Sequence, residues 1–161
     1  MNPAEILRTL ARHEVEHIVV GGTAAVLMGA PVQTLDLDIV YSRSETNVPR
    51  LLAALTELQA VFRTDSRRLT PNASHLRSTG HKLLETRFGV LDVLGTVEED
   101  TSYEDLLADA VPLLVADTRV LVLSLPRLIA MKEKLTRPKD RAMLLVLRAT
   151  LEERERLERS Q

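Results

Sequence analysis

The sequence predicts one domain with an α/β (α+β) fold: a mixed β-sheet flanked by helices and followed by a C-terminal helical part. Short runs of β-branched residues alternate along the chain with longer stretches in which apolar residues recur every three or four positions. The first pattern indicates buried strands and the second indicates amphipathic helices. No linker or internal repeat divides residues 1–161, so we expect a core at about 15–123 and the helical part at about 124–159.

The first 60 residues are expected to form, in order, a helix, a strand, a helix, a strand and a helix. Asn2 can cap the first helix with Pro3 in its first turn, and Ile18–Val20 is a β-branched run suited to a buried strand. The remaining three elements are predicted as a short helix over 23–28, a strand over 34–39 and an amphipathic helix over 48–60.

The rest of the chain is expected to add further strands and three helices. In chain order these are a hairpin over 82–87 and 90–94, a helix from Thr101 or Ser102 to Ala110, strands over 111–115 and 119–123, a helix over 125–135, and a last helix from Pro138. The charged tail beyond Glu152 is expected to fray.

Composition excludes several classes of protein. The chain has no Cys, which excludes disulfides, zinc-thiolate sites and thiol nucleophiles. Aromatic residues make up 2% and the net charge is -2, which argues against base-stacking platforms and against a global nucleic-acid footprint. No apolar run approaches the length of a membrane span, and no signal peptide is visible at the start. We therefore expect a soluble cytoplasmic protein with no membrane partner.

A glycine pair follows the first predicted strand. Gly21 and Gly22 let the backbone turn sharply and approach a ligand closely. The helix expected from Thr23 would direct its first free N–H groups back at this turn, an arrangement that favours phosphates. Gly21, Gly22 and Thr23 are therefore candidate phosphate-binding residues.

Two carboxylates follow in the second predicted strand. Alternation in a strand puts Thr34, Asp36 and Asp38 on one face. The opposite face, which carries Leu35, Leu37 and Ile39, is expected to be buried. The two acids repel each other, and a divalent cation such as Mg²⁺, which prefers oxygen ligands, would cancel that repulsion. The alternative is a solvated polar strand face.

Asp92 stands alone inside an apolar strand and needs a partner, because a buried unpaired carboxylate is costly. That partner could be a metal shared with Asp36 and Asp38, or one of the nearby arginines. The preceding segment, 63–87, has six Lys or Arg residues against two acids and many loop-forming residues. It is expected to be a polar segment that either holds a triphosphate or an RNA acceptor, or is simply solvated.

Together these residues resemble the nucleotidyltransferase superfamily, whose pattern is a glycine pair after an apolar residue, a short gap, Asp-x-Asp, and a third acid on a later strand. Gly21-Gly22, Asp36-Leu37-Asp38 and Asp92 match it. Within the superfamily the chain resembles small bacterial proteins related to the AbiEii toxins and minimal nucleotidyltransferases. Their closing motif is similar to the stretch from Leu125 to Leu144, where Lys132 would contact the triphosphate and Lys139-Asp140 would form a Lys-Asp pair. Without the resemblance, these three residues are expected on helix surfaces with intrahelical pairs.

The resemblance implies transfer of a nucleoside monophosphate from an NTP to a hydroxyl acceptor. Asp36 and Asp38 would hold Mg²⁺ or Mn²⁺, and Asp92 would ligate a second ion and orient or deprotonate the acceptor. The acceptor could be RNA such as tRNA, another protein, the enzyme itself or a small aminoglycoside-like molecule, and a cognate toxin or antitoxin could be a partner. The alternative is a non-catalytic nucleotide- or RNA-binding protein of the same fold, such as an antitoxin or regulatory partner.

Overall fold

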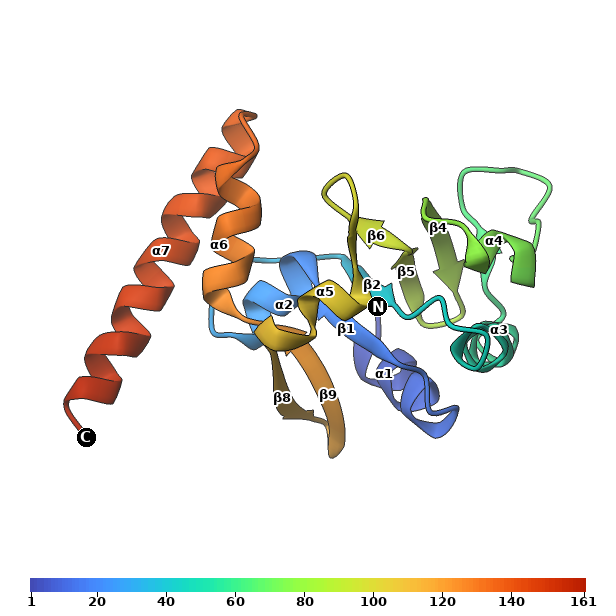
Figure 1. Ribbon diagram of the computed structural model, residues 1–161, viewed down its shortest axis with the longest axis horizontal. Coiled ribbons are helices and arrows are strands. Elements are labelled where there is room, and N and C mark those ends of the chain that lie inside the picture. The colour runs from blue at the N-terminus through green and yellow to red at the C-terminus, as the bar shows by residue number, and fades with distance from the viewer.

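A seven-stranded mixed sheet forms the centre of the molecule in the computed structural model, which describes residues 1–161 (Figure 1). Its strand order is β3-β4-β5-β2-β1-β9-β8. The strands are β1 (His17–Val20), β2 (Asp36–Tyr41), β3 (Val61–Phe62), β4 (His81–Thr86), β5 (Gly89–Leu94), β8 (Ala110–Val115) and β9 (Thr118–Leu123). The pairs β2–β5 and β1–β9 are parallel and the others are antiparallel, so the expected mixed α/β fold is confirmed.

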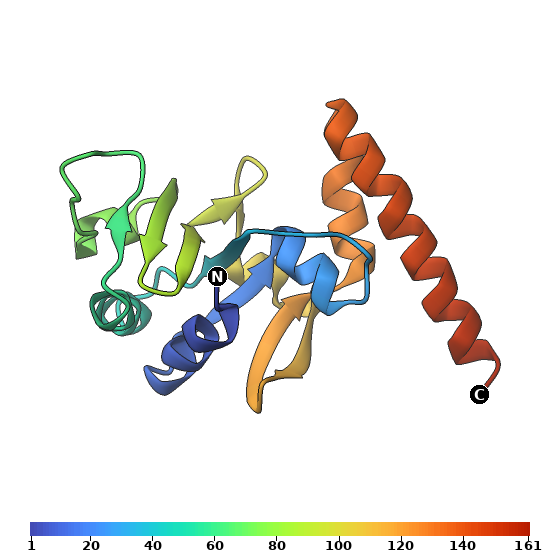
Figure 2. The same cartoon turned by 180° about the vertical axis from the view of Figure 1, so that it is seen from behind.

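Helices cover the sheet and extend beyond it. They are α1 (Pro3–Arg12), α2 (Gly21–Leu27), α3 (Asn47–Glu57), α4 (Ala73–Arg77), α5 (Tyr103–Leu106), a 3₁₀ turn (Leu107–Asp109), α6 (Leu125–Glu133) and α7 (Pro138–Arg159). Figures 1 and 2 show α6 and α7 side by side at one end of the molecule, with the C-terminus far from the sheet. None of the helices combines the length and the apolar character that crossing a membrane would require.

The helix ends follow their sequence signals. The Asn2 side chain accepts a hydrogen bond from the Glu5 backbone N–H, and Ser124 does the same for Arg127 at the start of α6. Ser102 and Asp105 form a reciprocal capping box at α5. A capping side chain satisfies N–H groups that have no partner inside the helix. These caps fix where α1, α5 and α6 begin.

The core is almost entirely aliphatic. Thirty-six buried apolar residues form one cluster, in which Tyr41 and Tyr103 are the only aromatic side chains. Tyr41 is fully buried, and its hydroxyl donates to the Leu76 carbonyl at 2.7 Å, which satisfies its polar atom. A chain with so few aromatic residues thus builds its core mainly from Leu, Val, Ile and Ala.

Several expected boundaries are wrong. Leu35 is 80% exposed instead of buried, because β2 begins at Asp36 and Leu35 still belongs to the preceding loop. The helix after the glycine pair begins at Gly21 instead of Thr23. The last helix continues to Arg159 instead of fraying after Glu152.

Short elements were missed. The basic segment 63–87, expected to be largely loop, contains α4. A separate two-stranded sheet of β6 (Thr96–Val97) and β7 (Thr101–Ser102) precedes α5, where a longer helix was expected.

Candidate active site

Three carboxylates lie on two neighbouring strands at the centre of the sheet. Asp36 and Asp38 share one face of β2, while Leu37 and Ile39 are fully buried on the other face. In the parallel register with β5, Asp38 lies directly opposite Asp92. In the antiparallel register with β1, Asp38 lies opposite Val20, the residue just before the glycine pair. The sheet therefore brings the acids and the glycines to one point.

The carboxylate of Asp38 is strongly affected by its surroundings. Its pKa is raised to about 6, first by burial and then by the negative charges of Asp92 and Asp36 and a hydrogen bond with Asp92. The positive charge of Arg63 lowers this pKa and so offsets only part of the increase. The carboxylates therefore repel one another, and the site carries an excess of negative charge.

Asp92 is paired with an arginine. Its side chain is buried, and both of its oxygens accept hydrogen bonds from the guanidinium of Arg63, with Nη2 at 3.1 Å from Oδ2. The hydrogen bond with Asp92 and the charges of the three carboxylates raise the pKa of Arg63, which is therefore always charged. Of the two partners expected for Asp92, the structure contains the arginine. No three His, Asp or Glu side chains form a ready metal-binding cluster.

Within the glycine pair, only at Gly21 does the backbone conformation require a glycine. Gly21 has φ of +68°, in the left-handed region, and a Cβ placed on it would lie 2.5 Å from Oδ2 of Asp38. Gly22 has no positive φ, and its Cβ would lie 3.0 Å from Oγ1 of Thr34. The close approach to the carboxylates is therefore made by the backbone of Gly21.

Thr23 links α2 to β2 through a hydrogen bond. Its side chain is buried, and its hydroxyl donates to the Asp36 carbonyl at 2.8 Å. This bond fastens α2 to the start of β2 and thereby holds the first acid beside the glycine turn. A contact between Thr23 and phosphate stays a prediction from the sequence.

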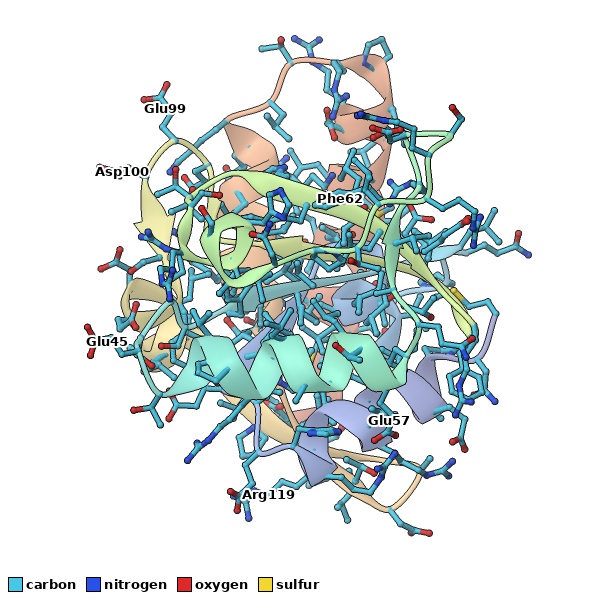
Figure 3. All side chains as sticks on the ribbon, turned by 90° about the vertical axis from the view of Figure 1, so that its right-hand side faces the viewer. Glu45, Glu57, Phe62, Glu99, Asp100 and Arg119 are labelled. Atoms are coloured by element: carbon cyan, nitrogen blue, oxygen red, sulfur yellow. The ribbon has the colours of Figure 1, made fainter.

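A cavity of about 730 Å³ opens beside Gly21 and Asp38. Its volume falls within the usual range for small-molecule sites. The apolar part of its wall comes from β1, β5, β6, α6 and the turn after α6, through Val20, Leu94, Val97, Leu128, Met131 and Leu135. Its polar part includes Lys132 on α6, Lys134 directly after α6, and Glu98, Glu99 and Asp100 on the loop between β6 and β7. Figure 3 shows Glu99 and Asp100 on this loop with their side chains turned outward.

Lys132 is held at the cavity by the last helix. Its ammonium lies 3.0 Å from Oδ1 of Asp140, and Arg137 binds the other oxygen of Asp140 at 2.7 Å. The hydrogen bonds of Arg137 and Lys132 lower the pKa of this 1% exposed carboxyl, which is therefore charged. Lys132 and Asp140 thus pair between α6 and α7, and not within one helix as the surface alternative expected. Lys139 is exposed and does not line the cavity.

Two residues of the site were not found from the sequence. Arg63 lies 29 positions before its partner Asp92, and only the basic character of segment 63–87 pointed to it. Glu98 pairs with both Arg127 and Lys134, which fastens the β6–β7 loop to α6 across the cavity mouth. No periodicity signals such a contact, because Glu98 lies at a turn between two-residue strands.

The donor set fits a divalent cation at Asp36 and Asp38. Both side chains offer carboxylate oxygens from one strand face, and burial together with the nearby charges of Asp92 and Asp36 raises the pKa of Asp38, an effect that a bound cation would offset. Asp92 is a less suitable ligand for the cation, because both of its oxygens accept hydrogen bonds from Arg63.

The fold is shared with solved nucleotidyltransferase structures. The chain is similar to a crystal structure of the lincosamide antibiotic adenylyltransferase LnuA with lincomycin bound, with a TM-score of 0.64 and 13% identity over 92% of this chain and 96% of that one. It is also similar to a Thermotoga maritima protein described as a candidate nucleotidyltransferase, with a TM-score of 0.56 and 20% identity over 93% and 90% of the two chains. The sequence matches no protein-family model and no curated protein. At these identities the likeness shows a common fold.

Proposed function

We propose that this protein is a Mg²⁺- or Mn²⁺-dependent nucleotidyltransferase that transfers a nucleoside monophosphate from an NTP to a hydroxyl acceptor. The observation that carries the proposal is the convergence of Asp36, Asp38 and Asp92 on one face of the sheet beside the Gly21 turn, with Asp38 and Lys132 lining the same cavity. The shared fold with nucleotidyltransferase structures supports it.

Each of these residues has a task in this reaction. Gly21 lets the triphosphate approach the backbone closely, and Lys132 neutralises the leaving pyrophosphate. Asp36 and Asp38 would hold the divalent cation, which when bound stabilises negative charge on phosphate oxygens. Asp92 orients the acceptor hydroxyl, whose oxygen forms a bond to the α-phosphorus while the bond from that phosphorus to the bridging oxygen breaks. The proton leaves to Asp92 or to solvent, and pyrophosphate departs.

Acidic residues at the rim of the cavity indicate which class of acceptor is favoured. Glu99 and Asp100 are exposed at its mouth and form no ion pair, so they would repel RNA phosphates. Among the acceptors expected from the sequence, this favours a protein hydroxyl over RNA such as tRNA. The name of LnuA is a reason to include the small organic molecule among the acceptors that should be tested. A toxin–antitoxin role rests on the sequence resemblance, and growth arrest on expression of the chain alone would support it.

The reaction can be tested directly. The protein is incubated with each α-labelled NTP and Mg²⁺, in the presence of total RNA, cell lysate protein or hydroxylated small molecules, and the labelled product is identified. We expect one acceptor class to take label in a reaction that the Asp36→Asn/Asp38→Asn double variant does not perform. Nucleotide binding without label in any acceptor would instead support the non-catalytic alternative, a nucleotide- or RNA-binding regulatory partner.

Lys132 and Lys139 provide a matched pair of variants. Lys132→Met should weaken the affinity for NTP about 10- to 100-fold, because it removes a charged hydrogen bond to phosphate. Lys139→Met should leave the affinity almost unchanged, because Lys139 lies outside the cavity. Calorimetric titration with a non-hydrolysable NTP and Mg²⁺ measures both. Equal losses in the two variants would show that the cavity is not where the triphosphate binds.

A further inference from the structure

Arg63 is anchored in the acidic site by more than one contact. It follows the edge strand β3, and its backbone N–H donates to the Leu83 carbonyl at 3.1 Å. Nη1 also donates to the Leu84 carbonyl at 3.2 Å as the side chain extends across β4 to Asp92 on β5. The Arg63 side chain is three-quarters buried and that of Asp92 is nine-tenths buried. The guanidinium is therefore a built part of the site and not a mobile surface group.

One divalent cation balances the net charge of the acidic site. Asp36, Asp38 and Asp92 carry three negative charges, and Arg63 contributes one positive charge at the same place. The remaining two negative charges equal the charge of one divalent cation. The planar guanidinium also engages both oxygens of Asp92, the geometry in which arginine holds a carboxylate most firmly.

We propose that Arg63 serves as a fixed counter-charge for Asp92 and limits the acidic site to one divalent cation, held by Asp36 and Asp38. A second cation can be coordinated by Asp92 only if it displaces the guanidinium of Arg63. This inference rests on the proposed function, because it concerns the metal site of that reaction. It departs from the expectation that all three carboxylates share the metals.

Counting bound ions tests this inference without measuring turnover. Mn²⁺ is titrated into the protein after dialysis against EDTA, and free Mn²⁺ is followed by electron paramagnetic resonance. We expect the native chain to bind one ion per chain. Arg63→Met, which keeps an apolar stem and removes the charge, should bind a second ion at least about tenfold more tightly than the native chain does, since an opposite charge at this range shifts a carboxylate equilibrium by one to three decades.

Matched variants separate this role from a structural one. Arg68→Met removes a neighbouring arginine that pairs with the exposed Glu85, and it should bind one ion like the native chain. Arg63→Lys keeps the charge and should also bind one ion. Arg63→Met combined with Asp92→Asn should lose the second ion again, because its ligand is gone.

Asp92→Asn alone keeps the test decisive if Arg63→Met does not fold. With Arg63 holding Asp92, this variant should bind the same single ion as the native chain. Two ions of similar affinity in the native chain, with one lost in Asp92→Asn, would overturn the inference and leave the proposed reaction standing. Absence of Mn²⁺ binding in every variant would overturn both.

Discussion

Replacing Asp38 by Asn should make the protein more stable at neutral pH when no divalent ion is present, and should also abolish nucleotidyl transfer. The pKa of Asp38 is about 6 in the folded protein against 3.8 for the free side chain, so the folded state holds this proton more tightly. The folded state therefore loses stability as the pH rises from about 4 to about 6, and the loss is complete above pH 6. Asn carries no charge and removes that loss, a gain of up to about 3 kcal/mol.

Urea denaturation in EDTA across pH 3.5–8 measures this effect. The stability advantage of Asp38→Asn should be near zero at pH 4 and largest above pH 6. Glu45→Gln is a suitable control because Glu45 is an exposed acid that forms no ion pair, as Figure 3 illustrates. An advantage that is greatest in acid, or no advantage at pH 7.5, would contradict the account of crowded charge at the site.

The same variant should lose function. With one ligand neutralised, added Mn²⁺ should no longer raise the melting temperature, because stabilisation by a ligand requires binding to the folded state. Transfer should fall on the order of 10²–10³-fold or more, the range seen when one group that stabilises transition-state charge is removed. A variant that is more stable and inactive would show that the acidic site is maintained for its reaction at the expense of the fold.

Gly21→Ala should have the second large effect. Alanine at φ of +68° costs about 1–2 kcal/mol by backbone strain alone. Its Cβ would also lie 2.5 Å from Oδ2 of Asp38, so that carboxylate must rotate away from its present position. We expect lower stability together with loss of the Mn²⁺ response and of transfer, measured by thermal denaturation with and without Mn²⁺.

Two other glycines separate backbone strain from displacement of the carboxylate. Gly29 has φ of +100°, but its Cβ would meet open space, so Gly29→Ala should lose stability and keep the Mn²⁺ response. Gly22→Ala meets Thr34 at 3.0 Å without a strained φ and should have an intermediate effect. A full Mn²⁺ response in Gly21→Ala would show that the glycine does not position Asp38.

The parts of the site that follow from local periodicity were predictable. Asp36 and Asp38 share a face because strand side chains alternate, and Ser124 marks the start of the helix that carries Lys132. The mixed sheet followed from the β-branched runs and the amphipathic helices between them. Leu35 was misplaced because alternation gives the face of a residue but not the position where pairing begins.

The parts that depend on side chains far apart in sequence were not predictable. A lone Asp in an apolar strand signals that Asp92 needs a partner, yet nothing in the sequence chooses between a metal and one of several arginines. The choice of Arg63 depends on the strand order β3-β4-β5, which brings its side chain across β4. Likewise, the pair formed by Lys132 and Asp140 depends on how α6 packs against α7.

The parallel pairs at the middle of the sheet have a consequence for how the chain folds. Val19 on β1 pairs with Val122 on β9, and Asp38 on β2 pairs with Asp92 on β5, so the innermost strands meet partners made much later during synthesis. Such long-range pairing closes large loops before any contact offsets their entropy, which slows folding. In a nascent chain β1 and β2 can pair with each other, but the outer edge of each stays unpaired until β5 and β9 have emerged from the ribosome. The acidic centre is assembled only late, because a chain that ends before β5 lacks Asp92.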